Sequence, residues 1–188
     1  MLTLKGKKTT LEEFSRKHLE DPRYMDWLRD LDVIATINRI EYMLPIDPAI
    51  VPEYVASLQA SDTEAFFAIL DENGEFVGTA RIAHIDWRMG VGNIGVMIGD
   101  KQSWGKGLAT DVVRTLADYA FNLLSLRKLI SAPSGGNVGM CRCFEKVGFR
   151  REGCIRQDLL IRGEYFDRIC YGMFRDEFEA ANKDAESV

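Results

Sequence analysis

The chain has 188 residues, 46% of them hydrophobic and 28% charged, which is typical of a soluble globular protein long enough to bury a sizeable core. The formal net charge of −5 gives no indication of binding to nucleic acid or to an anionic membrane, and is compatible with a small cationic or amine ligand. No apolar run approaches the roughly 18 residues of a spanning helix, and no signal-peptide core follows the N-terminus. A cytoplasmic protein is therefore expected.

The first half of the chain predicts helices followed by a β-hairpin. Residues 11–31 and 47–60 have mostly helical patterns, and Asp47 is placed to cap the second helix. Residues 65–86 form the clearest hairpin, because Asn73-Gly74 suits a type I′ turn between two apolar runs.

The second half alternates strands and helices and ends in two strands. A strand is expected at 93–99, a long helix at 108–124, a buried strand at 126–132, a short helix at 138–147, and strands at 149–161 and 164–174. Residues 179–188 are polar and predicted to be frayed. This order predicts one mixed α/β (α+β) domain over 1–188, with a largely antiparallel sheet and a core of about residues 7–178.

The cysteines and histidines do not have the spacing of a zinc site, so no metal is expected. We expect the thiols to be free and at least partly buried. The cysteines are Cys141, Cys143, Cys154 and Cys170, and the histidines are His18 and His84.

Two nucleotide-binding motifs are excluded by context. Gly90, Gly92 and Gly95 match the letters of a dinucleotide fingerprint, but a strand rather than a helix follows them. The segment from Gly99 onward lacks the spacing of a Walker loop, and Gly107 stands where that motif needs a hydroxyl.

The segment WGKGLAT, residues 104–110, joins a strand to a helix. Gly105 and Gly107 let the backbone approach a ligand, and the first helical turn offers unpaired N–H groups with a positive dipole. Such a loop suits a pyrophosphate bound without a metal. A plain glycine-rich turn is the alternative, and spacing alone does not decide between them.

Two sequence blocks resemble the GNAT N-acetyltransferases. Gln102, Gly105 and Gly107 fill the pattern Q/R-x-x-G-x-G/A of the acetyl-CoA loop. Residues 137–149, NVGMCRCFEKVGF, resemble a second signature, N-x-x-S-x-x-x-x-E-K-x-G-F. The likeness covers about residues 7–178 and is strongest to the branch of ribosomal-protein alanine, polyamine and amino-sugar acetyltransferases.

The resemblance implies a sheet splayed between its fourth and fifth strands, with a short first strand near residues 2–6 and the pantetheine arm of acetyl-CoA in the cleft. Met97, Ile98 and Gly99 would then bind pantetheine through their backbone, and Asn137 and Phe144 would flank the arm near the thioester. The loop residues that would hold the pyrophosphate are Gln102, Trp104, Gly105, Lys106, Gly107, Leu108, Ala109 and Thr110.

The sequence also departs from the family pattern at three chemically important places. Asn93 replaces the carboxylate that many members carry on the fourth strand, so an obvious general base is missing. Met140 replaces a serine and Phe144 a tyrosine, and neither can donate a proton to the departing thiolate. We therefore expect catalysis mainly by proximity and by backbone polarisation of the acetyl carbonyl.

The remaining candidates for catalysis and acceptor binding lie elsewhere in the chain. His84 and Asp86 would share one face of a strand, as would Tyr165 and Asp167. Structural roles, a turn carboxylate for Asp86 among them, are the alternative. The catalytic candidates are thus His84, Asp86, Asn93 and Tyr165. The acceptor-binding candidates are Arg39, Glu41 and Asp167. For Arg39 and Glu41, the alternative is a solvated helix end.

The predicted function is transfer of the acetyl group of acetyl-CoA to the primary amine of a small molecule. The segments MIGDKQSWGKG and DWLRD favour an amino-sugar nucleotide by resemblance. A polyamine or a protein N-terminus is the alternative acceptor, and a non-catalytic acyl-CoA-binding module is the alternative function. No nucleic acid or membrane partner is expected, and a homodimer is compatible with the sequence.

Overall fold

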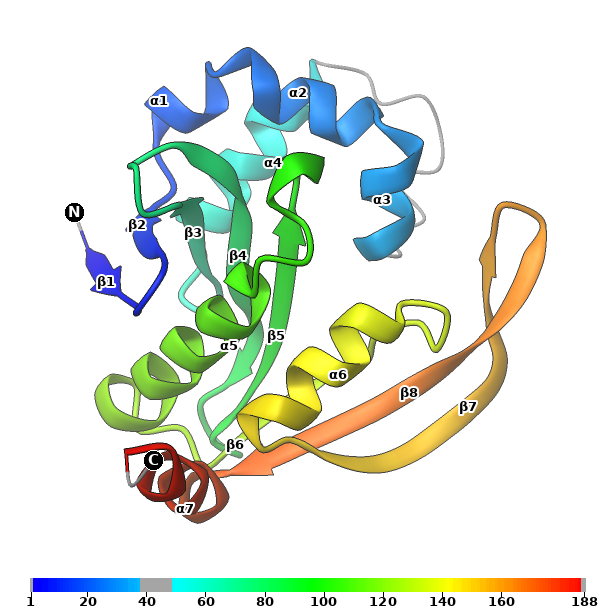
Figure 1. Ribbon diagram of the computed structural model, residues 1–188. Coiled ribbons are helices and arrows are strands. Elements are labelled where there is room, and N and C mark those ends of the chain that lie inside the picture. Colours follow the sequence, from blue (N-terminus) through cyan, green and yellow to red (C-terminus); the bar gives the residue numbers. More distant parts are fainter. Residues whose placement is uncertain (1, 38–48, 187–188) are drawn as a thin grey trace.

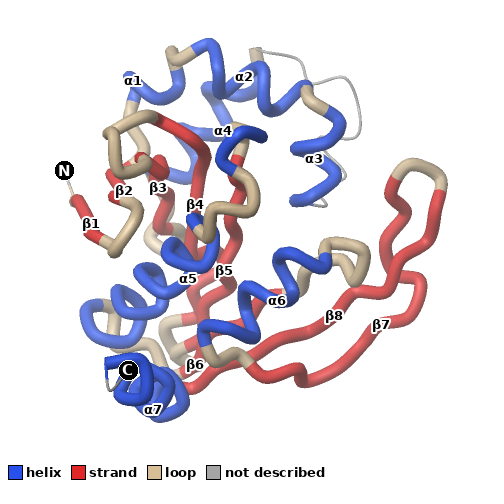
Figure 2. The backbone as a smooth tube through the Cα atoms, viewed as in Figure 1, coloured by secondary structure: helices blue, strands red, loops and turns tan. Residues whose placement is uncertain are grey.

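The computed structural model describes residues 2–37 and 49–186, which form a single curved sheet with helices on both faces (Figures 1 and 2). The strands are β1 (Thr3–Lys5), β2 (Thr10–Glu13), β3 (Ala65–Leu70), β4 (Phe76–Asp86), β5 (Val91–Ile98), β6 (Lys128–Ser131), β7 (Arg150–Ile161) and β8 (Glu164–Phe174). The α-helices are α1 (Arg16–Leu19), α2 (Pro22–Arg29), α3 (Leu31–Ile37), α4 (Ile50–Gln59), α5 (Leu108–Asp118), α6 (Val138–Val147) and α7 (Arg175–Glu186). A 3₁₀ turn, η2 (Lys101–Ser103), precedes α5, and a π-helical turn, η3 (Tyr119–Leu123), follows it.

The sheet has the strand order β1-β2-β3-β4-β5-β6-β8-β7. All neighbouring strands are antiparallel except β5 and β6, which pair in parallel only from Val91 to Asn93. Beyond Asn93, β5 continues to Ile98 without a partner strand on its β6 side. The mixed, mostly antiparallel sheet is confirmed, and its splay lies between β5 and β6, the fourth and fifth strands if β1 and β2 are counted as one.

Two hydrophobic cores cover the two faces of the sheet. On one face α5, α6 and α7 pack through residues such as Leu116, Phe144 and Phe178. On the other face α1 to α4 enclose an aromatic cluster around Phe14, with Trp27 packed on Phe76. Among the described residues, no helix is both long and apolar enough to cross a bilayer.

Several sequence predictions of secondary structure are corrected by the structure. Residues 10–13 are a strand rather than helix, because β2 pairs with both β1 and β3. The β3–β4 turn is not type I′, because Gly74 has a φ of +80° while Asn73 is not in the left-handed region. Asp71 stabilises this turn by accepting hydrogen bonds from the N–H groups of Asn73 and Glu75.

Helix α7 continues to Glu186, into the segment that the sequence predicts to be frayed, and Phe178 packs in the core at 2% exposure. Helix α4 begins at Ile50, and Asp47, its predicted cap, lies outside the described residues. The four cysteines are unpaired, and burial raises the pKa of the Cys143 thiol to about 11.

His18 is buried in the aromatic cluster and is 3% exposed. Its Nδ1 accepts the N–H of Ser15 at 3.1 Å, so the ring proton resides on Nε2. In the described part of the chain Nε2 has no hydrogen-bond partner, and it lies 3.6 Å from a Glu12 carboxylate oxygen. Burial lowers the His18 pKa, Lys17 lowers it further, and Glu12 opposes both.

This lowered pKa predicts a pH-dependent stability. The unfolded chain takes up a proton near pH 6.5 while folded His18 resists it, so the free energy of unfolding should fall as pH drops through and below that value. His18→Gln should flatten this part of a chemical-denaturation profile measured from pH 8 to pH 5. His84→Gln, which removes the exposed second histidine, should retain the wild-type slope, and equal slopes for all three proteins would contradict the prediction.

Candidate active site

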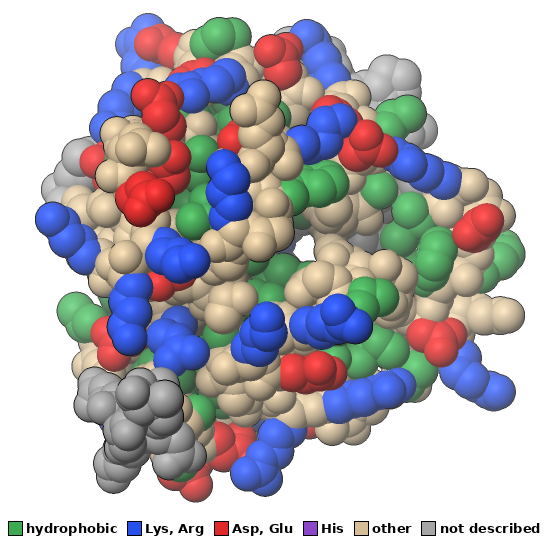
Figure 3. Space-filling view, viewed as in Figure 1, with side chains coloured by type: hydrophobic (Ala, Val, Ile, Leu, Met, Phe, Trp, Pro, Cys, Tyr) green, Lys and Arg blue, Asp and Glu red, His purple; other side chains and the backbone are tan. Residues whose placement is uncertain are grey.

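A cleft of about 260 Å³ opens where β5 and β6 separate. The cleft lies between α3 and α6, and Figure 3 shows the hollow near the centre of that face. Its lining combines backbone and side chains of β4 and β5 with the segment that follows β6. The lining residues include Thr36, Tyr54, Arg81, Asn93, Met97, Ser131, Met140, Phe144 and Arg168.

The unpaired edge of β5 presents backbone groups to this cleft. Ser131 donates its hydroxyl to the Ile94 carbonyl at 2.9 Å, which fixes the direction of that carbonyl toward the β6 side. The N–H and C=O groups of successive residues point to opposite edges of a strand. Those of Val96 and Ile98 therefore also point toward the β6 side, and those of Met97 point toward Thr79 on β4. The expectation for Met97 is therefore corrected: its side chain lines the cleft, but its backbone polar groups point away from it.

The end of β5 is closed by two tryptophans. The Trp104 indole donates to the Ile98 carbonyl at 2.8 Å, so that carbonyl is already occupied. A Cβ on Gly99 would lie 2.1 Å from the Trp27 ring, so a glycine is required for α2 to pack against the strand end. The Gly99 N–H donates to the Val77 carbonyl of β4 and so also points away from the cleft. The polar groups of this edge without a partner among the described residues are thus the N–H and C=O of Val96 and the N–H of Ile98.

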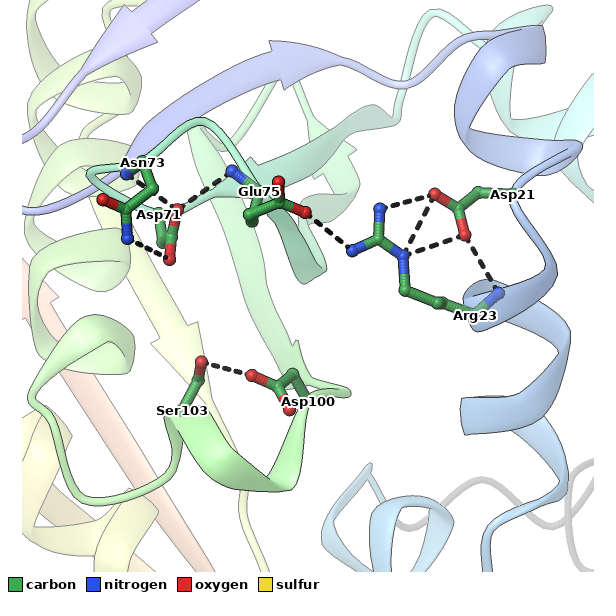
Figure 4. A network of polar contacts seen from close by, with 7 residues as sticks. All are labelled: Asp21, Arg23, Asp71, Asn73, Glu75, Asp100 and Ser103. Carbon is green, nitrogen blue, oxygen red and sulfur yellow. Dashed lines mark hydrogen bonds and ion pairs between the residues drawn. The ribbon is translucent and has the colours of Figure 1, made fainter.

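A loop rich in unpaired N–H groups follows β5. Asp100 stabilises η2 by accepting a hydrogen bond from the Gln102 N–H. It also accepts one from the Ser103 hydroxyl at 2.6 Å (Figure 4). Gly105 and Gly107 have φ values of +75° and +83°. The N–H groups of residues 105–107 donate to no other described residue, and those of residues 108–110, the first three of α5, have no intrahelical acceptor.

The β1–β2 turn supports this loop. Asp111, in the first turn of α5 and 9% exposed, accepts the N–H groups of Lys7, Lys8 and Thr9 and the Thr9 hydroxyl, all at 2.8–2.9 Å. The Lys8 ammonium donates to the Lys106 carbonyl at 3.0 Å. The N–H groups of the loop, the positive end of the α5 dipole and the Lys8 ammonium together form an environment suited to a phosphate group.

The second sequence block is only partly in the cleft. Phe144 and Met140 line it, with Phe144 1% exposed. Asn137 caps α6 by accepting the Met140 N–H at 3.1 Å and donates its amide to the Thr36 carbonyl of α3 at 3.2 Å. Asn137 therefore connects the helices on the two sides of the cleft, although it is not itself among the lining residues.

The proposed bases on β4 lie outside the cleft. His84 sits in a β-bulge with a φ of +51° and a side chain that is 75% exposed. Asp86 accepts the Met89 N–H at 2.9 Å, which is the turn role considered as its alternative. The bulge breaks the two-residue alternation, so the shared face expected for His84 and Asp86 does not point to the cleft.

Tyr165 and Asp167 are also not among the described lining residues, although Arg168 beside them is. Tyr165 is 66% exposed on β8. Asp167 accepts the Gln157 N–H at 2.9 Å and the Cys154 thiol at 3.4 Å, so its carboxylate stabilises the β7–β8 arm, and these hydrogen bonds lower its pKa. Arg39 and Glu41 lie outside the described residues.

The structure adds lining residues that the sequence reasoning did not identify, notably Arg81, Ser131 and Tyr54. A polar residue within the apolar β4 segment was the available signal for Arg81. Among the described lining residues there is no histidine and no carboxylate, and Asn93 cannot accept the proton of an ammonium. The described residues also contain no group of three or more potential metal ligands.

Comparison with known proteins identifies the family. The model of the acetyltransferase (GNAT) domain matches residues 8–150. The chain belongs to the GNAT acetyltransferase family.

Curated relatives of this GNAT protein include enzymes with different acceptors. The putative ribosomal N-acetyltransferase YdaF of Bacillus subtilis is 30% identical over 64% of this chain and 66% of the relative. Spermidine N(1)-acetyltransferase of Escherichia coli is 25% identical over 87% of this chain and 86% of the relative. The chain spans 63% and 71% of the length of two further N-acetyltransferase relatives.

Solved structures agree in fold. A spermidine N-acetyltransferase of Vibrio cholerae, in complex with CoA and spermine, superposes with a TM-score of 0.81 at 19% identity, covering 91% of this chain and 98% of that one. At this identity the likeness concerns the arrangement of the sheet and helices. It places this chain in the same architecture.

Proposed function

We propose that this protein transfers the acetyl group of acetyl-CoA to the primary amine of a small molecule bound in the β5–β6 cleft. The observation that carries the proposal is the continuity of the unpaired β5 edge with the loop at residues 105–107. One extended ligand that has amide groups at one end and a pyrophosphate at the other can use both features.

The chain's own residues have distinct roles in this proposal. The N–H groups of residues 105–110 hold the pyrophosphate, with the Lys8 ammonium beside them. The backbone of Val96 and the N–H of Ile98 align the pantetheine arm, and a β5 N–H polarises the acetyl carbonyl. The bound donor supplies the acetyl thioester that the amine attacks.

Proton transfer relies on water, because the described cleft lining offers no histidine or carboxylate. Only the neutral amine can attack, so the reaction should depend on the amine's own ionisation and on its positioning near the thioester. Catalysis by proximity suits a donor whose leaving group is a thiolate.

The acceptor is the least constrained part of the function. The relatives include a spermidine acetyltransferase and a putative ribosomal acetyltransferase, and neither name indicates the amino-sugar nucleotide favoured by the sequence segments. The charge of the described cleft lining is an independent criterion, because its two charged side chains, Arg81 and Arg168, are both cationic.

Incubation with acetyl-CoA and a panel of primary amines tests the proposal, with release of the free thiol as the readout. We expect turnover with at least one amine and an initial rate that rises with pH as the neutral fraction of that amine increases. Coenzyme binding without turnover across the whole panel would favour a non-catalytic acyl-CoA-binding module instead. Heat-denatured protein and omission of the amine control for spontaneous thioester hydrolysis.

A further inference from the structure

Arg81 projects from the centre of β4 into the cleft. It pairs with Gly95 on β5, and a Cβ on Gly95 would lie 3.4 Å from Arg81 Cγ and Nε. The missing side chain at residue 95 therefore leaves room for the arginine to extend across β5. The guanidinium reaches the same cleft as Asn93, and the Arg81 side chain is 18% exposed.

The described neighbours of Arg81 orient its guanidinium without saturating it. Nη1 donates to the Tyr54 hydroxyl at 3.1 Å. The Glu64 Oε2 atom lies 3.9 Å from Nη1, which is too long for a hydrogen bond. An arginine carries five N–H donors, so several of them remain available to a ligand in the cleft.

Glu64 supports this arrangement from behind the cleft lining. Its side chain is 9% exposed, its Oε1 accepts the His84 N–H at 3.1 Å, and its buried Oε2 has no hydrogen-bond partner among the described residues. If Arg81 and Glu64 formed a purely structural ion pair, the guanidinium and the carboxylate would be expected to make a direct, bidentate contact. Here the two groups remain apart, so the guanidinium stays available on its cleft side.

The rest of the cleft lining carries no described group that would attract a cation. Arg168 is the other charged lining residue in the described part of the chain, and its Nε lies 2.5 Å from an Asp158 oxygen. Arg168 is thus already paired, whereas Arg81 has no carboxylate within hydrogen-bond distance among the described residues. In the described part of the cleft, a polycationic acceptor would meet a guanidinium and no carboxylate.

We propose that Arg81 is a specificity residue that binds an anionic group, a carboxylate or a phosphate, carried by the acceptor amine. This inference rests on the proposed acetyl transfer and specifies the chemical class of its acceptor. The planar guanidinium matches both anions through paired hydrogen bonds, and Tyr54 and Glu64 keep its orientation. The amine would then be positioned for attack by an interaction at its other end.

Matched pairs of acceptors test this assignment and distinguish the two anions. The pairs are an α-amino acid with its carboxamide, and glucosamine 6-phosphate with glucosamine, and spermidine serves as the polycation. For the wild-type protein we expect kcat/KM to be at least about 10-fold higher for the anionic member of one pair, a ratio that one charge-assisted contact supplies. The pair that shows the ratio identifies the anion.

Arg81→Gln should remove this preference by raising KM for the anionic amine about 10- to 100-fold, with the neutral partner changed by less than about 2-fold. Arg81→Lys keeps the charge and should retain part of the preference. Arg88→Gln removes an equal charge from the exposed β4–β5 turn and should have no effect. If Arg81→Gln folds poorly, the double variant Arg81→Gln with Glu64→Gln removes the uncompensated carboxylate and gives the same readout.

Calorimetric binding of the same amines in the presence of CoA separates this inference from the proposed function. Loss of anion binding in Arg81→Gln supports the inference even if no amine turns over. Turnover that favours spermidine or the neutral amines, or a preference that survives Arg81→Gln, overturns it while acetyl transfer stands. Absence of both turnover and anion-dependent binding overturns it as well.

Discussion

Replacing Gly107 by aspartate is expected to weaken acetyl-CoA binding by about 100-fold, with little loss of folded protein. Gly107 has a φ of +83° and directly precedes α5, where the proposed pyrophosphate would lie. Aspartate tolerates this backbone region better than most residues, so strain contributes little. A carboxylate placed among N–H groups that bind a pyrophosphate adds repulsion of a few kcal/mol, about 100-fold in affinity.

Two variants separate charge from shape in this experiment. Gly107→Asn introduces a side chain of equal size without the charge and should cost clearly less affinity. Gly163→Asp makes the identical substitution at the same φ of +83°, in the β7–β8 turn, where a new Cβ meets nothing within 4 Å. Titration calorimetry with CoA measures all three, and an unchanged dissociation constant for Gly107→Asp would exclude the loop as the pyrophosphate site.

The glycine loop illustrates which features can be predicted from sequence. Positive φ values, helix capping and the helix dipole are local properties, so the spacing of Gly105 and Gly107 specifies the loop geometry directly. The same holds for α6, which ends at Gly148 with a φ of +113° as its sequence indicates. Local sequence patterns also predict β5 and β6, the strands on either side of the cleft.

The cleft lining depends on long-range pairing and is less accessible to sequence reasoning. Whether Arg81 faces α4 or α5 is decided by the register between β4 and β5, and the bulge at His84 reverses the alternation after it. A strict two-residue period places His84 and Asp86 together on one face of β4, and the bulge breaks that shared face. Strand β2 is hidden from sequence patterns for a similar reason, since its Leu-Glu-Glu segment is extended only because strands flank it on both sides.

Asp111 shows how one long-range contact supports the site, and its removal is expected to have the largest effect on stability. The carboxylate accepts four hydrogen bonds from Lys7, Lys8 and Thr9, residues more than 100 positions away in the chain. Asp111→Ala leaves at least three backbone N–H groups without an acceptor, each worth about 1–3 kcal/mol when buried. Because part of this turn can rehydrate, we expect a loss of about 3–5 kcal/mol in the free energy of unfolding.

Asp118→Ala is the matched control for this prediction. Asp118 lies at the exposed end of the same helix and accepts one side-chain hydrogen bond, from Asn122 at 2.9 Å. Its removal should change the free energy of unfolding by less than about 0.5 kcal/mol in urea denaturation. Because the β1–β2 turn carries Lys8 to the Lys106 carbonyl, Asp111→Ala should also weaken CoA binding in protein that is still folded. A variant that loses neither stability nor CoA affinity would show that the turn keeps its place beside α5 without this carboxylate.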